Sequence, residues 1–423
     1  MGRYKILKER DHAEGTHVIE GVNKDSINMT QYEQELSNSV SVVSFTHLGY
    51  KKDLKSFPTY YSVKSLYEEN MVDKIYVLDV ADSYDIDRST LSIPIPGGKF
   101  IPRILYAIGS IVPQINARNI IIRLLDAAAS KKVGEEKVLH TFPQFINSIE
   151  NSKKHNATSA VYASFSHPNH TRSLLASEHQ KYYNRNNLNK TKMAVRHGFD
   201  KADYILYLSE YSKDTFIENG FEENRLLKVG PLGTDIDHYT PTTPPEDEFV
   251  AVSVANMAEL KGIRYLIDAW EKLSIPNARL ILCGTMNKAV ETALKPRIER
   301  MESVDHVGYV DDPHEYYKKA SVLVHPSLTE GFSKTISEAM ASELPVIITE
   351  HCQREFIDNA GFVVPIRDSD AIADRLQYIY EHPEEAKEMG QRGRKITEQN
   401  TWDDFSTRVM EAHKEILRRE DHV

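Results

Sequence analysis

The second half of the chain alternates short apolar runs with segments whose apolar residues recur at helical spacing. The runs that predict strands are Phe249–Val254, Leu280–Cys283, Val322–His325, Val346–Thr349 and Phe362–Val364. The segments that predict helices span 263–273, 287–302, 313–320 and 333–342. Strands that are apolar on both faces and alternate with helices are typical of a parallel sheet covered by helices on both sides. This half is therefore predicted to be a doubly wound α/β domain.

The first half repeats this pattern less regularly. Its candidate strands are Val40–Phe45, Lys74–Asp79, Val138–His140, Ala160–Phe165 and Tyr204–Leu208, with helical segments between them. Residues 1–38 have weak periodicity and receive no assignment. We therefore expect two Rossmann-like, doubly wound lobes that face each other across a cleft, with ligands at the carboxyl ends of the strands.

The clearest division lies at Pro241-Thr-Thr-Pro-Pro-Glu-Asp-Glu248, where three prolines and three acidic residues separate two apolar segments. Proline removes a backbone donor and interrupts helices, so this stretch predicts an interdomain linker. The predicted domains are residues 1–240 and 241–400, followed by a last helical segment at 401–423.

Composition narrows the class of protein. The chain has 423 residues, 40% of them hydrophobic and 27% charged, which is ordinary for a globular protein. Its net charge of −10 is unlike the basic footprint of a nucleic-acid-binding protein, so no nucleic-acid partner is expected. Two cysteines are too few for a disulfide framework, and the N-terminal segment lacks the apolar stretch of a signal peptide. A cytoplasmic location is expected, either free or in peripheral contact with the inner face of the membrane.

Candidate chemistry concentrates in the segment His325-Pro-Ser-Leu-Thr-Glu-Gly-Phe-Ser-Lys-Thr-Ile-Ser-Glu338. A strand ends at His325, a loop carries Glu330, and Ser333 can cap a helix that carries Glu338. The start of a helix offers free N–H groups and a positive dipole end, which suit a diphosphate. Two carboxylates beside an anion site suit a nucleotide sugar, one for the sugar and one for the ribose. The alternative is that both residues are structural: Glu338 would be an ordinary exposed helix residue, and Glu330 would cap a turn.

The same residues resemble the E-x7-E signature of retaining GT-B glycosyltransferases, closest to glycosyltransferase family 4. The similarity extends to Val254-Ala-Asn-Met-Ala-Glu-Leu-Lys261-Gly262, which is similar to the family's diphosphate-binding strand end, and to Pro231–Pro241, which is similar to the segment that leads into the hinge. It covers roughly residues 160–400. The resemblance implies a GT-B architecture, with the last helix packing back on the first domain.

The resemblance also implies a role for each matching position. Glu330 would contact the hydroxyls of the donor sugar, with the backbone of Gly331 and Phe332 near the same sugar. Glu338 would hold the ribose hydroxyls. Catalytic roles would fall to Glu330, to Lys261, which would neutralise the diphosphate leaving group, and to His167, which would face the donor sugar. The remaining substrate-binding positions would be Ser333, Lys334 and Thr335, through their backbone amides, and Asn256, which stands where the family commonly has arginine.

Other candidate metal or membrane sites in the sequence have simpler explanations. The triplets Asp85-Ile-Asp87, Asp235-Ile-Asp237 and Asp368-Ser-Asp370 could hold Mg²⁺ or Mn²⁺, but such triplets arise by chance among 62 acidic residues. His167 and His170 have a zinc-like spacing without completing ligands. We therefore expect neither a metal nor another cofactor. Residues 100–132 combine spaced apolar residues with basic flanks, which fits either a core helix or contact with a membrane surface.

The sequence therefore predicts a retaining glycosyltransferase that moves a hexosyl unit from a nucleotide-diphosphate sugar to an acceptor hydroxyl by a front-face mechanism. The acceptor would be a glycan, a lipid-linked sugar or a glycolipid. Two alternatives remain: a sugar-nucleotide 2-epimerase of similar fold, and a non-catalytic protein that binds sugar nucleotides. The base, the sugar, the linkage and the oligomeric state are not determined by the sequence.

Overall fold

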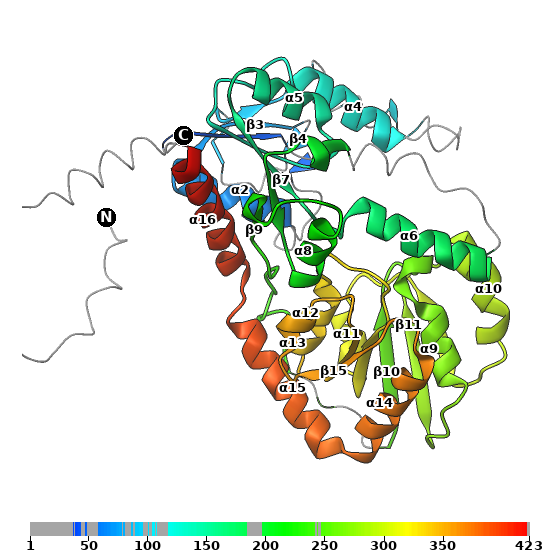
Figure 1. Ribbon diagram of the computed structural model, residues 1–423. Coiled ribbons are helices and arrows are strands. Elements are labelled where there is room, and N and C mark those ends of the chain that lie inside the picture. The colour runs from blue at the N-terminus through cyan, green and yellow to red at the C-terminus, as the bar shows by residue number, and fades with distance from the viewer. Residues whose placement is uncertain are drawn as a thin grey trace, which may run out of the picture.

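The computed structural model describes residues 39–43, 47–48, 58–77, 79–80, 86–87, 89–95, 117–183, 197–241 and 247–420, together with positions 37, 100, 104, 105, 107 and 243. Within these residues the chain forms two parallel sheets, each covered by helices, and a small pair of strands (Figure 1). The fold is thus the predicted pair of doubly wound α/β lobes.

The first sheet has the strand order β5-β3-β1-β6-β7-β8-β9, and all its pairs are parallel. Its strands are β1 (Val40–Val43), β3 (Val72–Tyr76), β5 (Leu91–Ser92), β6 (Val138–Thr141), β7 (Thr158–Tyr162), β8 (Tyr204–Tyr207) and β9 (Leu226–Lys228). The described helices between them are α2 (Pro58–Glu68), α4 (Ala117–Ala129), α5 (Ile146–Lys154), α6 (Pro168–Glu178) with its extension η2 (His179–Tyr183), α8 (Glu210–Ile217) and η3 (Glu223–Arg225). Strands β2 (His47–Leu48) and β4 (Asp79–Val80) form the separate pair.

The second sheet has the order β12-β11-β10-β13-β14-β15 and is also parallel throughout. Its strands are β10 (Phe249–Val254), β11 (Ala278–Cys283), β12 (Val304–Gly308), β13 (Val322–His325), β14 (Val346–Thr349) and β15 (Gly361–Val364). Its helices are η4 (Glu259–Lys261), α9 (Ile263–Trp270), α10 (Lys288–Ile298), α11 (His314–Tyr317), α12 (Lys334–Ala341), α13 (Arg354–Ile357), α14 (Ser369–Glu381) and α15 (Pro383–Glu398).

Both faces of the second sheet are buried, which explains why its strands read as continuous apolar runs. Ala251 and Leu282 lie in a core with residues of α9, α10 and α14, whereas Val252 and Leu323 lie in a core with residues of α11, α12 and α13. Successive side chains of a strand point to opposite faces of the sheet, so burial on both faces requires apolar residues at every position.

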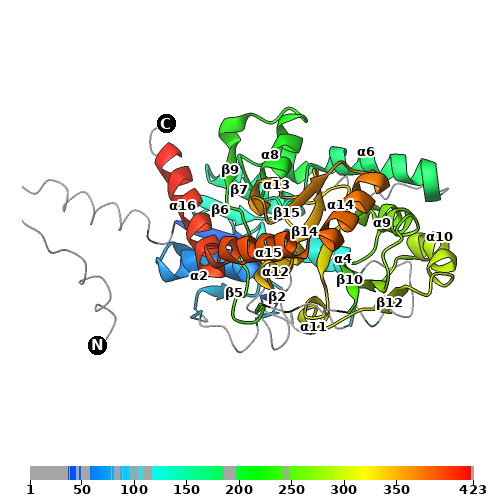
Figure 2. The same cartoon turned by 90° about the horizontal axis from the view of Figure 1, so that it is seen from below.

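The last helix, α16 (Trp402–Glu420), returns from the second lobe to the first. It lies beside α2 in both views (Figures 1 and 2). The Ser65 hydroxyl donates to the carbonyl of Ser406 at 2.6 Å, and the rings of Tyr61 and Trp402 stack with centroids 4.9 Å apart. Polar and aromatic contacts therefore tie the C-terminal segment to the first lobe.

Several element ends differ from those expected. Helix α10 starts one residue later than predicted, because Asn287 is its N-cap and accepts hydrogen bonds from Ala289 N and Val290 N. Helix α11 is shorter than the predicted 313–320 segment, and β7 ends at Tyr162 rather than at Phe165. Most of residues 1–38, Asp85 of the first triplet and much of the 100–132 segment lie outside the described residues.

Within the described part of 100–132, α4 has one face in the core and one facing solvent. Ile121, Ile122 and Leu125 are buried, whereas Ile120 and Leu124 are exposed, as is Arg123 between them. Residues 101–103, 106 and 108–116 of this segment lie outside the described residues. Helix α4, at the end of the segment, carries an apolar pair on its outer face. Among the residues described, no helix is both long enough and apolar enough to cross a bilayer.

Candidate active site

The predicted site residues gather where the strand order of the second sheet reverses. From β10 the chain adds β11 and β12 on one side, then crosses to β13 on the other side. Lys261 follows β10 and Glu330 follows β13, so the two loops meet at the carboxyl ends of adjacent parallel strands. This point in an open α/β sheet is where ligands bind in doubly wound folds.

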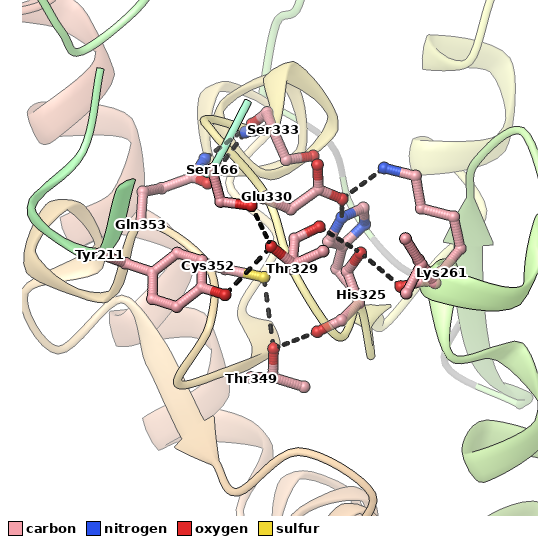
Figure 3. A network of polar contacts seen from close by, with 12 residues as sticks. Ser166, Tyr211, Lys261, His325, Thr329, Glu330, Ser333, Thr349, Cys352 and Gln353 are labelled. Carbon is pink, nitrogen blue, oxygen red and sulfur yellow. Dashed lines mark hydrogen bonds and ion pairs between the residues drawn. The ribbon is translucent and has the colours of Figure 1, made fainter. Parts of the chain in front are cut away.

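The Glu330 carboxylate is buried between the Lys261 ammonium and the His325 ring. Its Oε1 accepts a short hydrogen bond from the Lys261 ammonium and a second one, at 2.9 Å, from Nε2 of His325 (Figure 3). Burial alone would raise the pKa of Glu330, but the Lys261 charge and the His325 hydrogen bond outweigh it and hold the pKa well below its usual range. Glu330 is therefore an anion at neutral pH, and Oε1 already carries both protein contacts.

Two glycines allow the surrounding loops to approach closely. A Cβ atom on Gly262 would lie 1.9 Å from the carbonyl oxygen of Pro326, and Gly262 has a φ of +65° that favours glycine. A Cβ atom on Gly331 would lie 2.2 Å from the carbonyl oxygen of Ser164, which belongs to the first lobe. Glycine at these positions thus lets the Lys261 loop and a first-lobe loop lie directly against the Glu330 loop.

Glu338 lies on α12, beside the segment that joins the two lobes. It hydrogen-bonds with Tyr239 of that segment, and its Oε1 is 3.9 Å from the Lys334 ammonium. Burial raises the pKa of Glu338, against the opposing effects of Lys334 and Tyr239. Arg394 fixes this arrangement, because its Nη1 donates to the carbonyls of Tyr239 at 2.6 Å and Ala341 at 2.9 Å.

The start of α12 differs from the predicted helix cap. Ser333 occupies the N-cap position, but its side chain makes no capping hydrogen bond. Its backbone N–H instead donates to Gln353 Oε1 at 2.9 Å, and Gln353 Nε2 donates back to the Ser333 carbonyl at 2.7 Å. The Ser333 amide is therefore engaged by the protein. Lys334 and Thr335 form the first turn of α12, and Phe332 packs its ring edge-on against Phe356.

His167 and Asn256 make local contacts within their own lobes. The His167 ring is 1% exposed, packs against Phe216 and Phe221, and caps α6 by accepting a hydrogen bond from Asn169 N at 3.3 Å. This position in the first-lobe core does not fit the prediction that His167 faces the donor sugar. Asn256 is exposed beyond β10, and its Oδ1 accepts a hydrogen bond from Thr285 Oγ1 at 3.3 Å.

Several residues that contact the Glu330 loop have no role predicted from the sequence. His325 ends β13, Gln353 brackets the backbone of Ser333, and Tyr211 of α8 donates to Thr329 Oγ1 at 3.0 Å (Figure 3). The one available signal was His325, a polar residue at the end of a buried strand and five positions before Glu330. Gln353 and Tyr211 reach the loop only through the tertiary fold.

No group of three or more His, Cys, Asp or Glu side chains in the described part of the chain is arranged to hold a metal ion. Two of the Asp-x-Asp triplets contribute to local structure instead. Asp235 accepts a hydrogen bond from His238 N at 3.1 Å, and Asp368 caps α14 by accepting from Ala371 N at 2.9 Å. Asp370 pairs with Lys272 on the surface.

Comparisons with known proteins match most of the second lobe to one family model. Residues 238–396 match the family described as glycosyl transferases group 1. The EpsD protein of Bacillus subtilis (strain 168), named as a glycosyltransferase, is 32% identical over 191 residues, which cover 40% of this chain and 50% of EpsD. The chain spans about half the length of the curated relatives it matches.

Solved structures support the whole fold. Sucrose-phosphate synthase from Thermosynechococcus elongatus is similar with a TM-score of 0.60 and 18% identity, covering 90% of this chain and 99% of that one. HepE of Anabaena in complex with UDP-glucose is similar with a TM-score of 0.59 and 16% identity, covering 89% and 99%. The expected GT-B architecture is confirmed. This chain has a GT-B fold, and most of its second lobe matches the family described as glycosyl transferases group 1.

Proposed function

We propose that this protein is a retaining glycosyltransferase that moves a hexosyl unit from a nucleotide-diphosphate sugar to an acceptor hydroxyl. The observation that carries the proposal is the contact between Lys261 and Glu330 at the reversal point of the second sheet. The buried Glu330 carboxylate and the Lys261 ammonium, whose side chain is 29% exposed, are held together there. Both residues lie in the part of the chain that matches the glycosyl transferases group 1 family. The UDP-glucose complex of the similar HepE structure supports the class of donor.

In this proposal each end of the donor has its own partners. The diphosphate lies against Lys261 and the first turn of α12, where Lys334 and Thr335 lie, with Asn256 at its edge. The ribose hydroxyls donate to Glu338. The sugar hydroxyls donate to Glu330 beside Gly331 and Phe332. Because the Ser333 amide is bonded to Gln353, we assign it no contact with the donor.

The proposed reaction is a front-face substitution. The bond between the anomeric carbon and the diphosphate oxygen breaks while the acceptor oxygen attacks from the same side, and the acceptor proton passes to the departing diphosphate. Lys261 then compensates the negative charge that grows on the leaving group, where electrostatic stabilisation contributes most. Glu330 would stabilise the oxocarbenium-like sugar through its charge and its hydroxyl contacts. We assign no catalytic role to His167.

Turnover with and without acceptor separates this proposal from its alternatives. Purified protein is first screened by thermal shift against UDP-, GDP- and ADP-sugars, because a ligand at 100 times its dissociation constant stabilises the fold by about 2.7 kcal/mol. The stabilising donor is then incubated alone and with sugar or glycolipid acceptors. Transfer that requires an acceptor and retains the anomeric configuration supports the proposal. Epimerised donor without acceptor would indicate a 2-epimerase, and binding without turnover a non-catalytic protein.

We propose further that the acceptor is a glycan, a lipid-linked sugar or a glycolipid, and that α4 contacts the membrane that holds a lipid acceptor. Ile120 and Leu124 lie four residues apart on the outer face of α4, with Arg123 beside them. Sedimentation with anionic vesicles tests this contact. Leu124→Glu should reduce the bound fraction, whereas Gln399→Glu, which adds the same charge at an exposed position after α15, serves as the control for added charge.

A further inference from the structure

The loop that carries Glu330 is held by side chains of the first lobe on both sides of that residue. The Ser209 hydroxyl donates to the carbonyl of Gly331 at 2.6 Å, directly after Glu330. The Tyr211 hydroxyl donates to Thr329 Oγ1 at 3.0 Å, and Ser166 Oγ shares a hydrogen bond of 2.6 Å with the same oxygen. Figure 3 shows Ser166 and Tyr211 converging on Thr329.

These first-lobe residues are themselves fixed by regular structure. Ser166 lies in the loop after β7, whereas Ser209 and Tyr211 follow β8 at the start of α8. Ser209 caps α8 by accepting from Ser212 N at 3.1 Å, and the Tyr211 ring stacks on His351 of the second lobe with centroids 4.7 Å apart. All three side chains are buried. The contacts therefore join the segments after β7 and β8 of the first sheet to the loop after β13 of the second sheet.

We propose that Ser166, Ser209 and Tyr211 are positioning residues of the active site, which hold the Glu330 loop in its working geometry while the two lobes are closed. This inference rests on the proposed function. Lys261 and His325 hold the Glu330 carboxylate from within the second lobe. The first lobe holds the residues on either side of it, through the side-chain oxygen of Thr329 and the backbone carbonyl of Gly331. Separation of the lobes would break the flanking contacts, so closure and correct placement of Glu330 are coupled.

The expected kinetic signature separates positioning from binding. Tyr211→Phe keeps the ring that stacks on His351 and removes only the hydroxyl. A misplaced catalytic group can lower the rate by up to about 100-fold, so we expect kcat to fall about tenfold in this variant and further in Tyr211→Phe with Ser166→Ala. The donor KM should change little, and the affinity for the nucleoside diphosphate, which lacks the sugar, should be unchanged. Ser209→Ala is less informative because it also removes the cap of α8.

A second readout does not depend on activity. Amide hydrogen exchange is measured in the ligand-free, full-length protein for peptides that cover residues 328–333. We expect faster exchange there in Tyr211→Phe with Ser166→Ala. Tyr204→Phe is the matched control, because it removes a tyrosine hydroxyl that bonds to Glu420 at 3.3 Å near the first-lobe surface. It should leave both the exchange and kcat at wild-type values.

The two measurements keep this inference distinct from the proposed function. Unchanged exchange of 328–333 in the double variant, or a fall in kcat matched by Tyr204→Phe, would overturn the positioning role. If the wild-type protein transfers no sugar at all, the proposed function fails, and the exchange data alone decide whether the first lobe holds this loop. Faster exchange confined to 328–333, together with lower kcat at constant donor KM, supports the inference.

Discussion

The carboxylate of Glu330 and the ammonium of Lys261 are in contact although 69 positions separate the two residues in the chain. The contact exists because β10 and β13 are adjacent and parallel, so that the loops after them leave the same edge of the sheet. The proposed partners of the donor sugar and of its diphosphate are thereby preorganised against each other. Donor binding would replace part of this contact with contacts to the ligand.

Removing the charge of Glu330 should abolish most of the activity. Glu330→Gln keeps the size of the side chain but loses the negative charge beside the developing oxocarbenium-like sugar. Loss of one preorganised polar contact typically lowers the rate by about 10²–10³. Steady-state turnover of the best donor measures the effect, with the exposed Glu299→Gln as the control. A folded Glu330→Gln protein that keeps a tenth of wild-type turnover would contradict the assignment.

Lys261→Met should lower both turnover and stability. It leaves the buried Glu330 carboxylate without its ammonium partner, and hydrogen bonds to charged groups contribute about 1.5–3 kcal/mol. Because the folded pKa of Glu330 lies below its unfolded value, this contribution is present above the unfolded pKa and is lost as pH falls through the folded pKa. Urea unfolding should therefore show a difference between wild type and variant at pH 7 that shrinks in the acid range below the unfolded pKa.

The control for Lys261→Met is Lys272→Met. Lys272 pairs with Asp370 on the surface, where both side chains are exposed. Such pairs contribute about 0–1 kcal/mol, so this variant should unfold almost like the wild type. Equal losses of stability in the two lysine variants would argue against a special role for the Lys261 pair.

Glu338 should control nucleotide affinity and its pH dependence. Glu338→Ala removes the proposed acceptor of the ribose hydroxyls, so we expect the affinity for the nucleoside diphosphate to fall about 10- to 150-fold. Because burial raises the pKa of Glu338, wild-type affinity should begin to fall at a higher pH than an ordinary glutamate would allow. Calorimetric titration across the acid range tests both points. The exposed Glu315→Ala is the control, and an unchanged affinity in Glu338→Ala would make Glu338 a structural residue.

Activity should survive removal of divalent metals. In the proposed site the diphosphate faces Lys261 and the start of α12, whereas Asp235, Asp368 and Asp370 of the Asp-x-Asp triplets bond to backbone or to surface lysine. A metal-dependent enzyme would need carboxylates converging on the diphosphate to hold Mg²⁺. The assay is turnover after exhaustive chelation, followed by return of Mg²⁺ or Mn²⁺. Loss of activity that these ions restore would show that a cation supplies the charge missing at Asn256.

Acid should loosen the docking of α16 through a buried pair of histidines. His140 Nδ1 lies 3.1 Å from His413 Nε2, and His413 Nδ1 donates to the Val409 carbonyl at 2.8 Å. Burial lowers the pKa of His413 to about 4 and that of His140 well below its usual value. The unfolded chain therefore binds more protons than the folded one as pH falls from the ordinary histidine range toward 4, and stability falls with it.

Replacing both histidines tests this account. His140→Gln with His413→Gln removes both titrating groups, so the dependence of unfolding free energy on pH between about 6.5 and 4 should become shallower. His155→Gln, an exposed position in the same lobe, is the control and should keep the wild-type slope. A slope that the double variant leaves unaltered would show that other groups govern acid stability.

The sequence by itself determined the repeated α/β pattern and the loops that carry the chemistry. The strands Phe249–Val254, Val322–His325 and Val346–Thr349 coincide with the predicted runs, because burial on both faces of a parallel sheet demands apolar residues at every position. Lys261 and Glu330 could be placed in loops after two of these strands for the same reason. These features depend on residues that are close together in the chain, so hydrophobic periodicity and composition indicate them.

Only the tertiary structure decided which side chains meet. The adjacency of β10 and β13 brings Lys261 to Glu330, and the closure of the two lobes brings Tyr211 to Thr329. His167 is the opposite case, a residue whose surroundings the local sequence leaves open. Its local sequence suits a loop at the cleft as well as a helix cap, and only the positions of Phe216 and Phe221 bury its ring. Such contacts join residues far apart in the chain. They follow from strand order and lobe docking, which no local pattern encodes.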